Sequence, residues 1–129
     1  MGKLLRARHP GFEQLFSSPA CRALTTAHII AEKLGYAPQN IIVDAALYTF
    51  DTDGLYRFIE TVDDALSDIA IVGHNPAMTL LINELCTHTA IDNLPTCGVA
   101  ELELSITEWV EISPHKGELS NLYRPKNYR

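Results

Sequence analysis

The segment Ile69–Pro76, with the sequence Ile-Ala-Ile-Val-Gly-His-Asn-Pro, decides the fold of this chain. Its first four residues are apolar and three of them are β-branched, which predicts a buried strand over 69–72. Gly73 is expected to let the backbone turn, and the Asn-Pro pair favours the start of a helix that continues to about His88. His74 therefore stands between a strand and a helix N-terminus, where free N–H groups favour an anion. Ligands of open α/β sheets bind at such carboxyl ends of strands.

A second junction of this kind lies in the segment Ser17–Arg22, with the sequence Ser-Ser-Pro-Ala-Cys-Arg. We expect a short strand over 12–16 before it and a helix over 20–34 after it, with a serine as N-cap and Gly35 as C-cap. Arg22 falls in the first helical turn, where the helix dipole disfavours a cation. Two interpretations follow for Arg22: a surface arginine paired with a carboxylate, or an anion-binding residue whose planar guanidinium matches a phosphate group.

The rest of the chain continues to alternate between strands and helices. The expected elements are a helix over 1–9, a strand over 41–47, a loop over 48–54, a helix over 55–66, a strand over 99–106, its hairpin partner over 107–112 and a loosely held polar tail over 119–129. This order predicts an α/β fold whose sheet is parallel in part, with helices on both faces and an antiparallel end.

Composition excludes several functional classes. The 129 residues, 47% of them hydrophobic, suffice for one domain with a core. A formal net charge of −6 without a Lys/Arg cluster argues against nucleic acid, and no apolar run is long enough for a bilayer. The three cysteines have no metal-ligand spacing, so we expect reduced thiols in a cytoplasmic protein and no cofactor. A P-loop, a G-x-G-x-x-G motif and a nucleophile elbow are all missing.

Six segments of the chain, in their order and spacing, resemble the SixA-type phosphohistidine phosphatases of the histidine phosphatase (phosphoglycerate-mutase-like) superfamily. The matching segments are Ser17–Ala27, Leu47-Tyr48, Val72–Pro76, Pro95-Thr96, Trp109 and Arg124–Lys126. The resemblance implies a three-layer α/β/α sandwich with a mostly parallel sheet and an antiparallel C-terminal hairpin. It also implies a phosphatase that works through a phosphohistidine intermediate. Arg22 and His74 would be the catalytic residues that hold the phosphoryl oxygens, and Thr96 would add a phosphate contact.

The chain departs from this family at its start. The family's nucleophilic histidine lies in an Arg-His-Gly motif on a first strand that has no counterpart here, so we expect residues 1–129 to be one N-terminally truncated domain. His9, in Arg-His-Pro-Gly, follows a predicted helix and is interpreted as a helix-end residue. Thr49 occupies the position of the carboxylate that usually serves as acid or base in the family. Asp44 and Asp51 lie nearby but are expected to be cap or loop residues.

Three functional hypotheses remain open. The first is a phosphatase acting on a phosphorylated protein histidine or a small phosphoester, with its nucleophilic histidine absent from this chain. The second is a catalytically inactive phosphate-binding or interaction module. The third is a homodimer in which another protomer lends the missing strand. Because that strand is central in the family's sheet, we expect open strand edges and self-association. His28, His88 and His115 are interpreted as structural.

Overall fold

The computed structural model describes residues 13–86, 91 and 99–123 of the chain. The expected helix over 1–9 lies outside the described residues. The described elements are, in chain order, β1 (Gln14–Ser17), α2 (Cys21–Leu34), the 3-10 helix η1 (Pro38–Asn40), β2 (Ile42–Val43), the 3-10 helix η2 (Ala45–Leu47), α3 (Thr52–Glu60), β3 (Ile69–Val72), α4 (Ala77–Leu85), β4 (Val99–Leu104), the 3-10 helix η3 (Trp109–Glu111) and β5 (Gly117–Tyr123).

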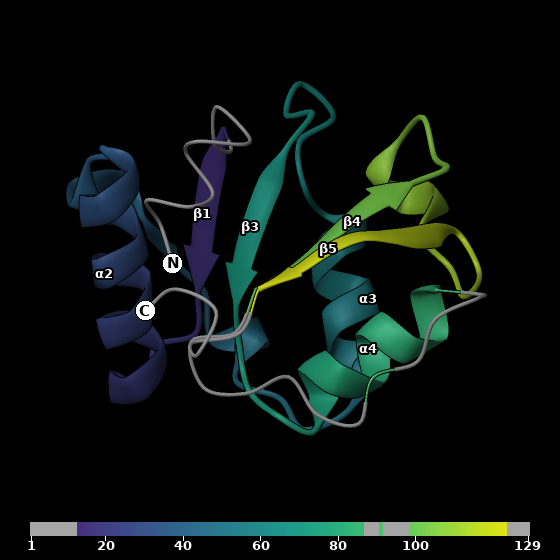
Figure 1. The fold of residues 1–129 in the computed structure, drawn as a ribbon, viewed down its shortest axis with the longest axis horizontal. Coiled ribbons are helices and arrows are strands. Elements are labelled where there is room, and N and C mark those ends of the chain that lie inside the picture. Colours follow the sequence, from purple (N-terminus) through teal and green to yellow (C-terminus); the bar gives the residue numbers. More distant parts are fainter. Residues whose placement is uncertain (1–12, 87–90, 92–98, 124–129) are drawn as a thin grey trace.

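Strand β1 lies beside β3 (Figure 1) and pairs on its other side with β2, so the parallel sheet has the strand order β2-β1-β3. Its last residue, Ser17, is in register with Val43 of β2 and with Val72 of β3. Strands β4 and β5 form a separate antiparallel pair. The parallel strands thus end at one level, and the segments that follow them meet at one edge of the sheet.

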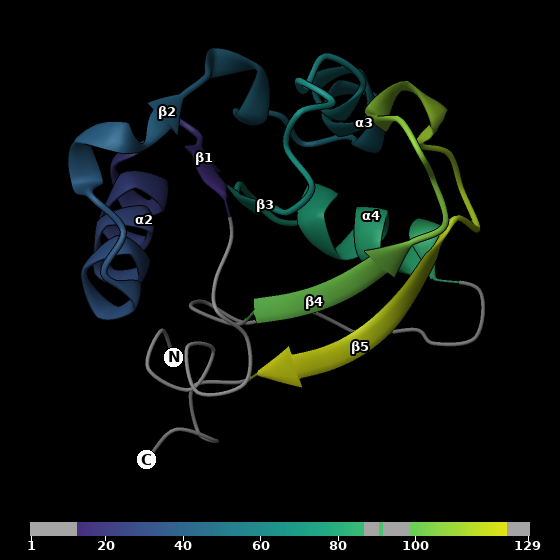
Figure 2. The same cartoon turned by 90° about the horizontal axis from the view of Figure 1, so that it is seen from above.

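The two faces of the parallel sheet pack against different helices (Figure 2). Successive residues of a strand point to opposite faces, so neighbours in β1 enter different cores. Leu15 packs with Ala27 and Ala31 of α2, whereas Phe16 packs with Phe58 of α3 and the buried residues of α4. Helices therefore cover both faces, which confirms the predicted α/β/α layers with a parallel sheet and an antiparallel C-terminal hairpin.

The strand predicted over 41–47 is much shorter in the structure. Strand β2 covers Ile42–Val43 and is followed directly by η2. Asp44 ends the strand because its side chain accepts a hydrogen bond from the backbone N–H of Ala46, at 2.9 Å, and so caps the 3-10 helix. The side chain of Leu47 is then fully buried at the end of η2. Local capping by an aspartate outweighs the β-branched composition here.

The predicted C-terminal hairpin, which pairs the strand over 99–106 with residues 107–112, is wrong in its second strand. The segment 107–112 contains the 3-10 helix η3, because Glu108 and Glu111 form a reciprocal capping box around it. The partner of β4 is β5, which includes the first part of the expected polar tail. Pairing uses backbone N–H and C=O groups, so a polar sequence such as that of β5 can pair with β4. Residues 124–129 lie outside the described residues.

Candidate functional site

The site begins with the aligned ends of the three parallel strands. The backbone N–H of Ser18, directly after β1, donates to the carbonyl of Val72 at 3.0 Å. The N–H of Asp44, directly after β2, donates to the carbonyl of Ser17 at 3.0 Å. These bonds extend the sheet by one residue and bring the loops after all three strands together. The predicted strand-to-helix junctions of Arg22 and His74 therefore lie at one carboxyl edge, where α/β folds bind ligands.

His74 is held in place by a serine. The hydroxyl of Ser18 lies 2.7 Å from Nε2 of His74 and accepts a hydrogen bond from the backbone N–H of Ala20 at 3.2 Å. Ser18 is completely buried, so this hydroxyl is shielded from water. A hydroxyl has one donor and two acceptor positions, so it satisfies both partners. The imidazole is thus fixed through Nε2, with Nδ1 as its second nitrogen.

This contact corrects the expected role of the serine. The N-cap of α2 is Ala20, without a side-chain cap, and α2 begins at Cys21. Ser18 instead orients His74, which lies 56 positions further along the chain. No local pattern predicts a pair so far apart in sequence, and the sequence therefore did not reveal Ser18 as a site residue. The C-cap at Gly35, with φ of 73°, is as predicted.

The turn into α4 is built from Gly73 and Asn75. Asn75 Oδ1 accepts hydrogen bonds from the N–H and the hydroxyl of Thr79, at 3.2 and 2.8 Å, while Pro76 is the N-cap residue. Gly73 does not have a left-handed φ, so glycine is not required here for that conformation. Its role is spatial, since a Cβ there would lie 3.0 Å from Sδ of Met78. The side chain of Met78, in α4, thus packs directly against the backbone at the end of β3.

Arg22 lies in the first turn of α2, exposed to solvent, and lines the same cavity as His74. The first turn of α2 contains no acidic residue that would neutralise it. Within the described part of the chain, the side chain of Arg22 forms no ion pair or hydrogen bond. The interpretation as a surface ion pair therefore has no described partner. A guanidinium at a helix N-terminus that has no partner among the described residues, and that lines the same cavity as an imidazole, is instead suited to an oxyanion.

Two exposed aromatic side chains complete the edge. The ring centroid of Tyr48 lies 4.9 Å from that of His74, and that of Phe50 lies 6.5 Å from it. Tyr48 and Phe50 meet edge to face, at 5.9 Å and 87°. The sequence had placed both in a polar loop over 48–54, although α3 already begins at Thr52. Their place beside His74 depends on the packing of η2, which sequence periodicity did not indicate.

The neighbouring carboxylates are engaged in caps, as their sequence context predicted. Asp44 caps η2, and Asp51 Oδ1 accepts a hydrogen bond from the N–H of Gly54 at 3.1 Å at the start of α3.

We expect Asp51→Ala to lower the free energy of unfolding by about 1 kcal/mol, because the cap is lost. Urea denaturation measures this, with Glu60→Ala in the last turn of α3 as the control. Phosphate affinity should stay unchanged; a loss of affinity or turnover would make Asp51 part of the site.

Other predicted residues lie elsewhere or outside the description. Thr96, His9 and His88 fall outside the described residues. His28 is exposed on α2, and the backbone N–H of His115 donates to the carbonyl of Glu84 at 3.0 Å. In the described ranges, no group of three or more His, Cys, Asp or Glu side chains is placed to hold a metal ion. Nor does any helix in that part of the chain have the length and apolar character needed to cross a membrane.

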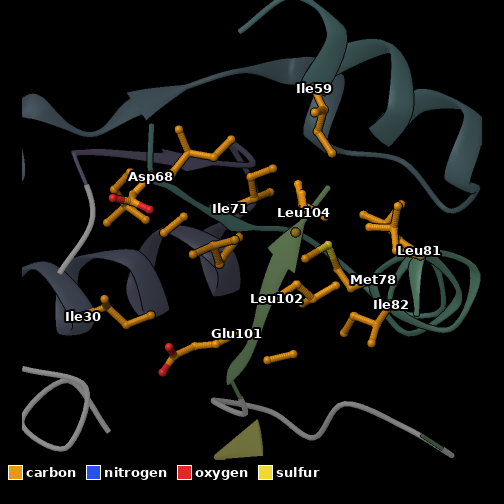
Figure 3. A pocket seen from close by; sticks show the side chains of 18 of the residues that line it. Ile30, Ile59, Asp68, Ile71, Met78, Leu81, Ile82, Glu101, Leu102 and Leu104 are labelled. Atoms are coloured by element: carbon orange, nitrogen blue, oxygen red, sulfur yellow. The ribbon is translucent and has the colours of Figure 1, made fainter. Parts of the chain in front are cut away.

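A large cavity separates the two sheets and runs up to the site. Its volume is about 1380 Å³, and it is lined by the consecutive residues 69–73 of β3 and its end and 100–104 of β4. Within the described residues, β3 pairs with β1 and β4 pairs with β5, so the facing edges of β3 and β4 do not pair with each other. Apolar side chains such as Ile71, Met78 and Leu102 surround the space (Figure 3). The cavity is thus a slot between two open strand edges.

We expect the 129-residue chain to self-associate through this slot. Open edges with free N–H and C=O groups pair with other strands, and burial of the apolar lining adds to the driving force. Light scattering coupled to size exclusion should give a mass above the 14.3 kDa of one chain, falling on dilution. A monodisperse monomer at all concentrations would contradict this expectation.

Known proteins were compared with the sequence and with the fold. No family model matches the sequence, and no curated protein matches it significantly. Two solved structures match the fold. A phosphohistidine phosphatase SixA from Nakamurella multipartitia has a TM-score of 0.76 and 19% identity, over 96% of this chain and 77% of that chain. The protein histidine phosphatase SixA complexed with tungstate has a TM-score of 0.73 and 18% identity, over 99% of this chain and 78% of that chain. The chain therefore has a SixA-type fold, as its motifs predicted.

Proposed function

We propose that this chain forms the phosphoryl-binding part of a phosphohistidine phosphatase. The observation that carries the proposal is that Arg22 and His74, from two separate strand-to-helix junctions, line one cavity at the carboxyl edge of a SixA-type fold. One of the two similar structures holds tungstate, a tetrahedral oxyanion like phosphate. The guanidinium, the imidazole and the N-termini of α2 and α4 are groups that stabilise the negative charge of a phosphoryl group in transfer.

In the proposed reaction, a histidine nucleophile attacks the phosphorus of the substrate. The bond between phosphorus and the substrate imidazole breaks, and its electron pair returns to the ring nitrogen. The substrate ring, protonated on its other nitrogen, leaves as a neutral imidazole. Water then attacks the phosphorylated nucleophile, which releases inorganic phosphate and the free histidine. Arg22 and His74 hold the oxygens through both steps, and Ser18 keeps His74 oriented. Asp44 and Asp51 act as caps, and an imidazole leaving group needs an acid less than an alkoxide does.

We further propose that the nucleophile lies outside residues 1–129, on a strand that enters the slot between β3 and β4. Three features support this: both edges are open within the described residues, the slot ends beside His74, and each similar structure extends beyond the part that this chain covers. A strand that paired with both edges would join the two sheets and satisfy their backbone groups. In a homodimer of protomers that each carry this added segment, the partner protomer would supply the same strand by exchange.

The intact mass of the endogenous protein tests this proposal. A mass larger by at least a strand and a loop, with an Arg-His-Gly sequence in the added segment, is the expected result. Purified in that form, the protein should release phosphate from a phosphohistidine peptide. A mass equal to that of these 129 residues would contradict the proposed nucleophile, because an identical partner protomer would lack the Arg-His-Gly sequence as well.

The alternative is a catalytically inactive module that binds a phosphorylated ligand. It is favoured by the absence of an Arg-His-Gly sequence from the chain. Such a module would bind phosphate through Arg22 and His74 without turnover in every form of the protein. In both cases the ligand is a phosphorylated protein histidine or a small phosphoester. The free cysteines Cys21 and Cys86 are in keeping with a cytoplasmic location, which we include in the proposal.

A further inference from the structure

The aromatic pair Tyr48 and Phe50 has no evident structural use. Tyr48 is 54% exposed and Phe50 is 60% exposed, although aromatic rings contribute most to stability when they are buried. The rings contact each other edge to face and stand on the loop between η2 and α3. Burial in the protein core therefore does not explain why both are placed here. Exposed aromatic side chains grouped beside a binding site are characteristic of ligand contacts.

The position of the pair connects it to the phosphoryl site. Phe50 lines the same cavity as Arg22 and His74, and the ring of Tyr48 lies tilted by 41° against that of His74, at 4.9 Å. A phosphoryl group held by Arg22 and His74 has its leaving group attached directly to the phosphorus. That leaving group is therefore within reach of the two rings. Its chemistry, and not that of the phosphate, is what these rings contact.

We propose that Tyr48 and Phe50 bind the leaving group and select a planar imidazole over an alkyl chain. This inference rests on the proposed function. A flat heterocycle presents a face or an edge to aromatic rings, and it becomes a cation when its free nitrogen is protonated. The negative faces of Tyr48 and Phe50 then favour the protonated ring. Because the nearby carboxylates are engaged in caps, this stabilisation has particular value at the moment when the leaving ring is released.

Binding measurements on the 129-residue chain test the inference without turnover. Three probes are titrated by calorimetry: inorganic phosphate, a phosphoserine peptide, and the same peptide with a non-hydrolysable phosphonate-bearing triazole in place of phosphohistidine. The variants are Tyr48→Leu with Phe50→Leu, which removes both rings, and Tyr48→Phe, which keeps the ring. Val110→Ala, at another exposed apolar residue, is the control.

The wild-type chain should bind the triazole peptide about tenfold more tightly than the phosphoserine peptide, because the flat triazole ring, which is uncharged at neutral pH, packs against Tyr48 and Phe50. The double leucine variant should lose that preference and keep its affinity for inorganic phosphate within twofold, whereas Tyr48→Phe and Val110→Ala should behave like the wild type. Equal wild-type affinity for the two peptides would overturn the inference. So would an equal loss for all three probes, since the rings would then only support His74. If inorganic phosphate does not bind the wild type, the proposed function itself fails.

Discussion

Replacing Arg22 by alanine is expected to weaken the binding of inorganic phosphate or vanadate by about 10- to 100-fold. Hydrogen bonds to charged groups contribute about 1.5–3 kcal/mol, which corresponds to this range. The guanidinium of Arg22 has no ion-pair partner within the described residues, so all of its donors are available to an oxyanion. Isothermal calorimetry at low ionic strength measures the effect, because salt would screen an exposed contact.

The same substitution, Arg22→Ala, is not expected to destabilise the fold. A cation in the first turn of a helix opposes the helix dipole, so Arg22→Ala should leave the free energy of unfolding unchanged or raise it by up to about 1 kcal/mol. Arg22→Lys keeps the charge but loses the two-pronged geometry, and should bind phosphate with intermediate affinity. Arg57→Ala, at an exposed arginine of α3, is the control. Phosphate affinity in Arg22→Ala within twofold of the wild type would show that the site is assigned wrongly.

The two junctions of the site follow from local sequence. Four apolar residues before Gly73, and the Asn-Pro pair after His74, define a strand and a helix start that need no distant contact to be seen. In the same way, the Ser-Ser-Pro segment before Arg22 predicts the end of a strand and the start of a helix. Parallel strands joined by helices then bring both junctions to one edge, so the chain order predicts their meeting. The structure confirms this part of the reasoning.

What the sequence did not reveal depends on contacts between distant segments. The hydrogen bond between Ser18 and His74 forms because β1 and β3 are neighbours in register. Strand β5 has a polar sequence, and its conformation comes from backbone pairing with β4. Tyr48 and Phe50 reach His74 because η2 shortens the predicted strand. In each case a tertiary contact overrides or adds to a local preference, and periodicity carries no information about it.

Replacing His74 by alanine is expected to lower the turnover of the form that contains the nucleophile by about 100- to 1000-fold. This is the loss seen when one preorganised donor to a developing oxyanion is removed. His74 qualifies as such a donor because Ser18, itself buried, fixes its ring through a 2.7 Å contact. Loss of the phosphoryl group from a phosphohistidine peptide, followed in quenched samples under single-turnover conditions, isolates the chemical step from product release.

The decisive comparison is between His74→Ala, a variant that keeps a hydrogen-bond donor in place of the imidazole, and a variant that keeps the imidazole but removes the serine that orients it. His74→Asn keeps a donor near the position of Nδ1, the nitrogen that Ser18 does not contact, and should retain part of the activity. Ser18→Ala leaves the imidazole but frees its orientation, so kcat should fall while the affinity for phosphate changes little. His28→Ala, at an exposed histidine of α2, should behave like the wild type. If His74→Ala retains full turnover, the phosphoryl oxygens are held elsewhere, and Arg22 with the helix N-termini would have to stabilise the transition state without an imidazole.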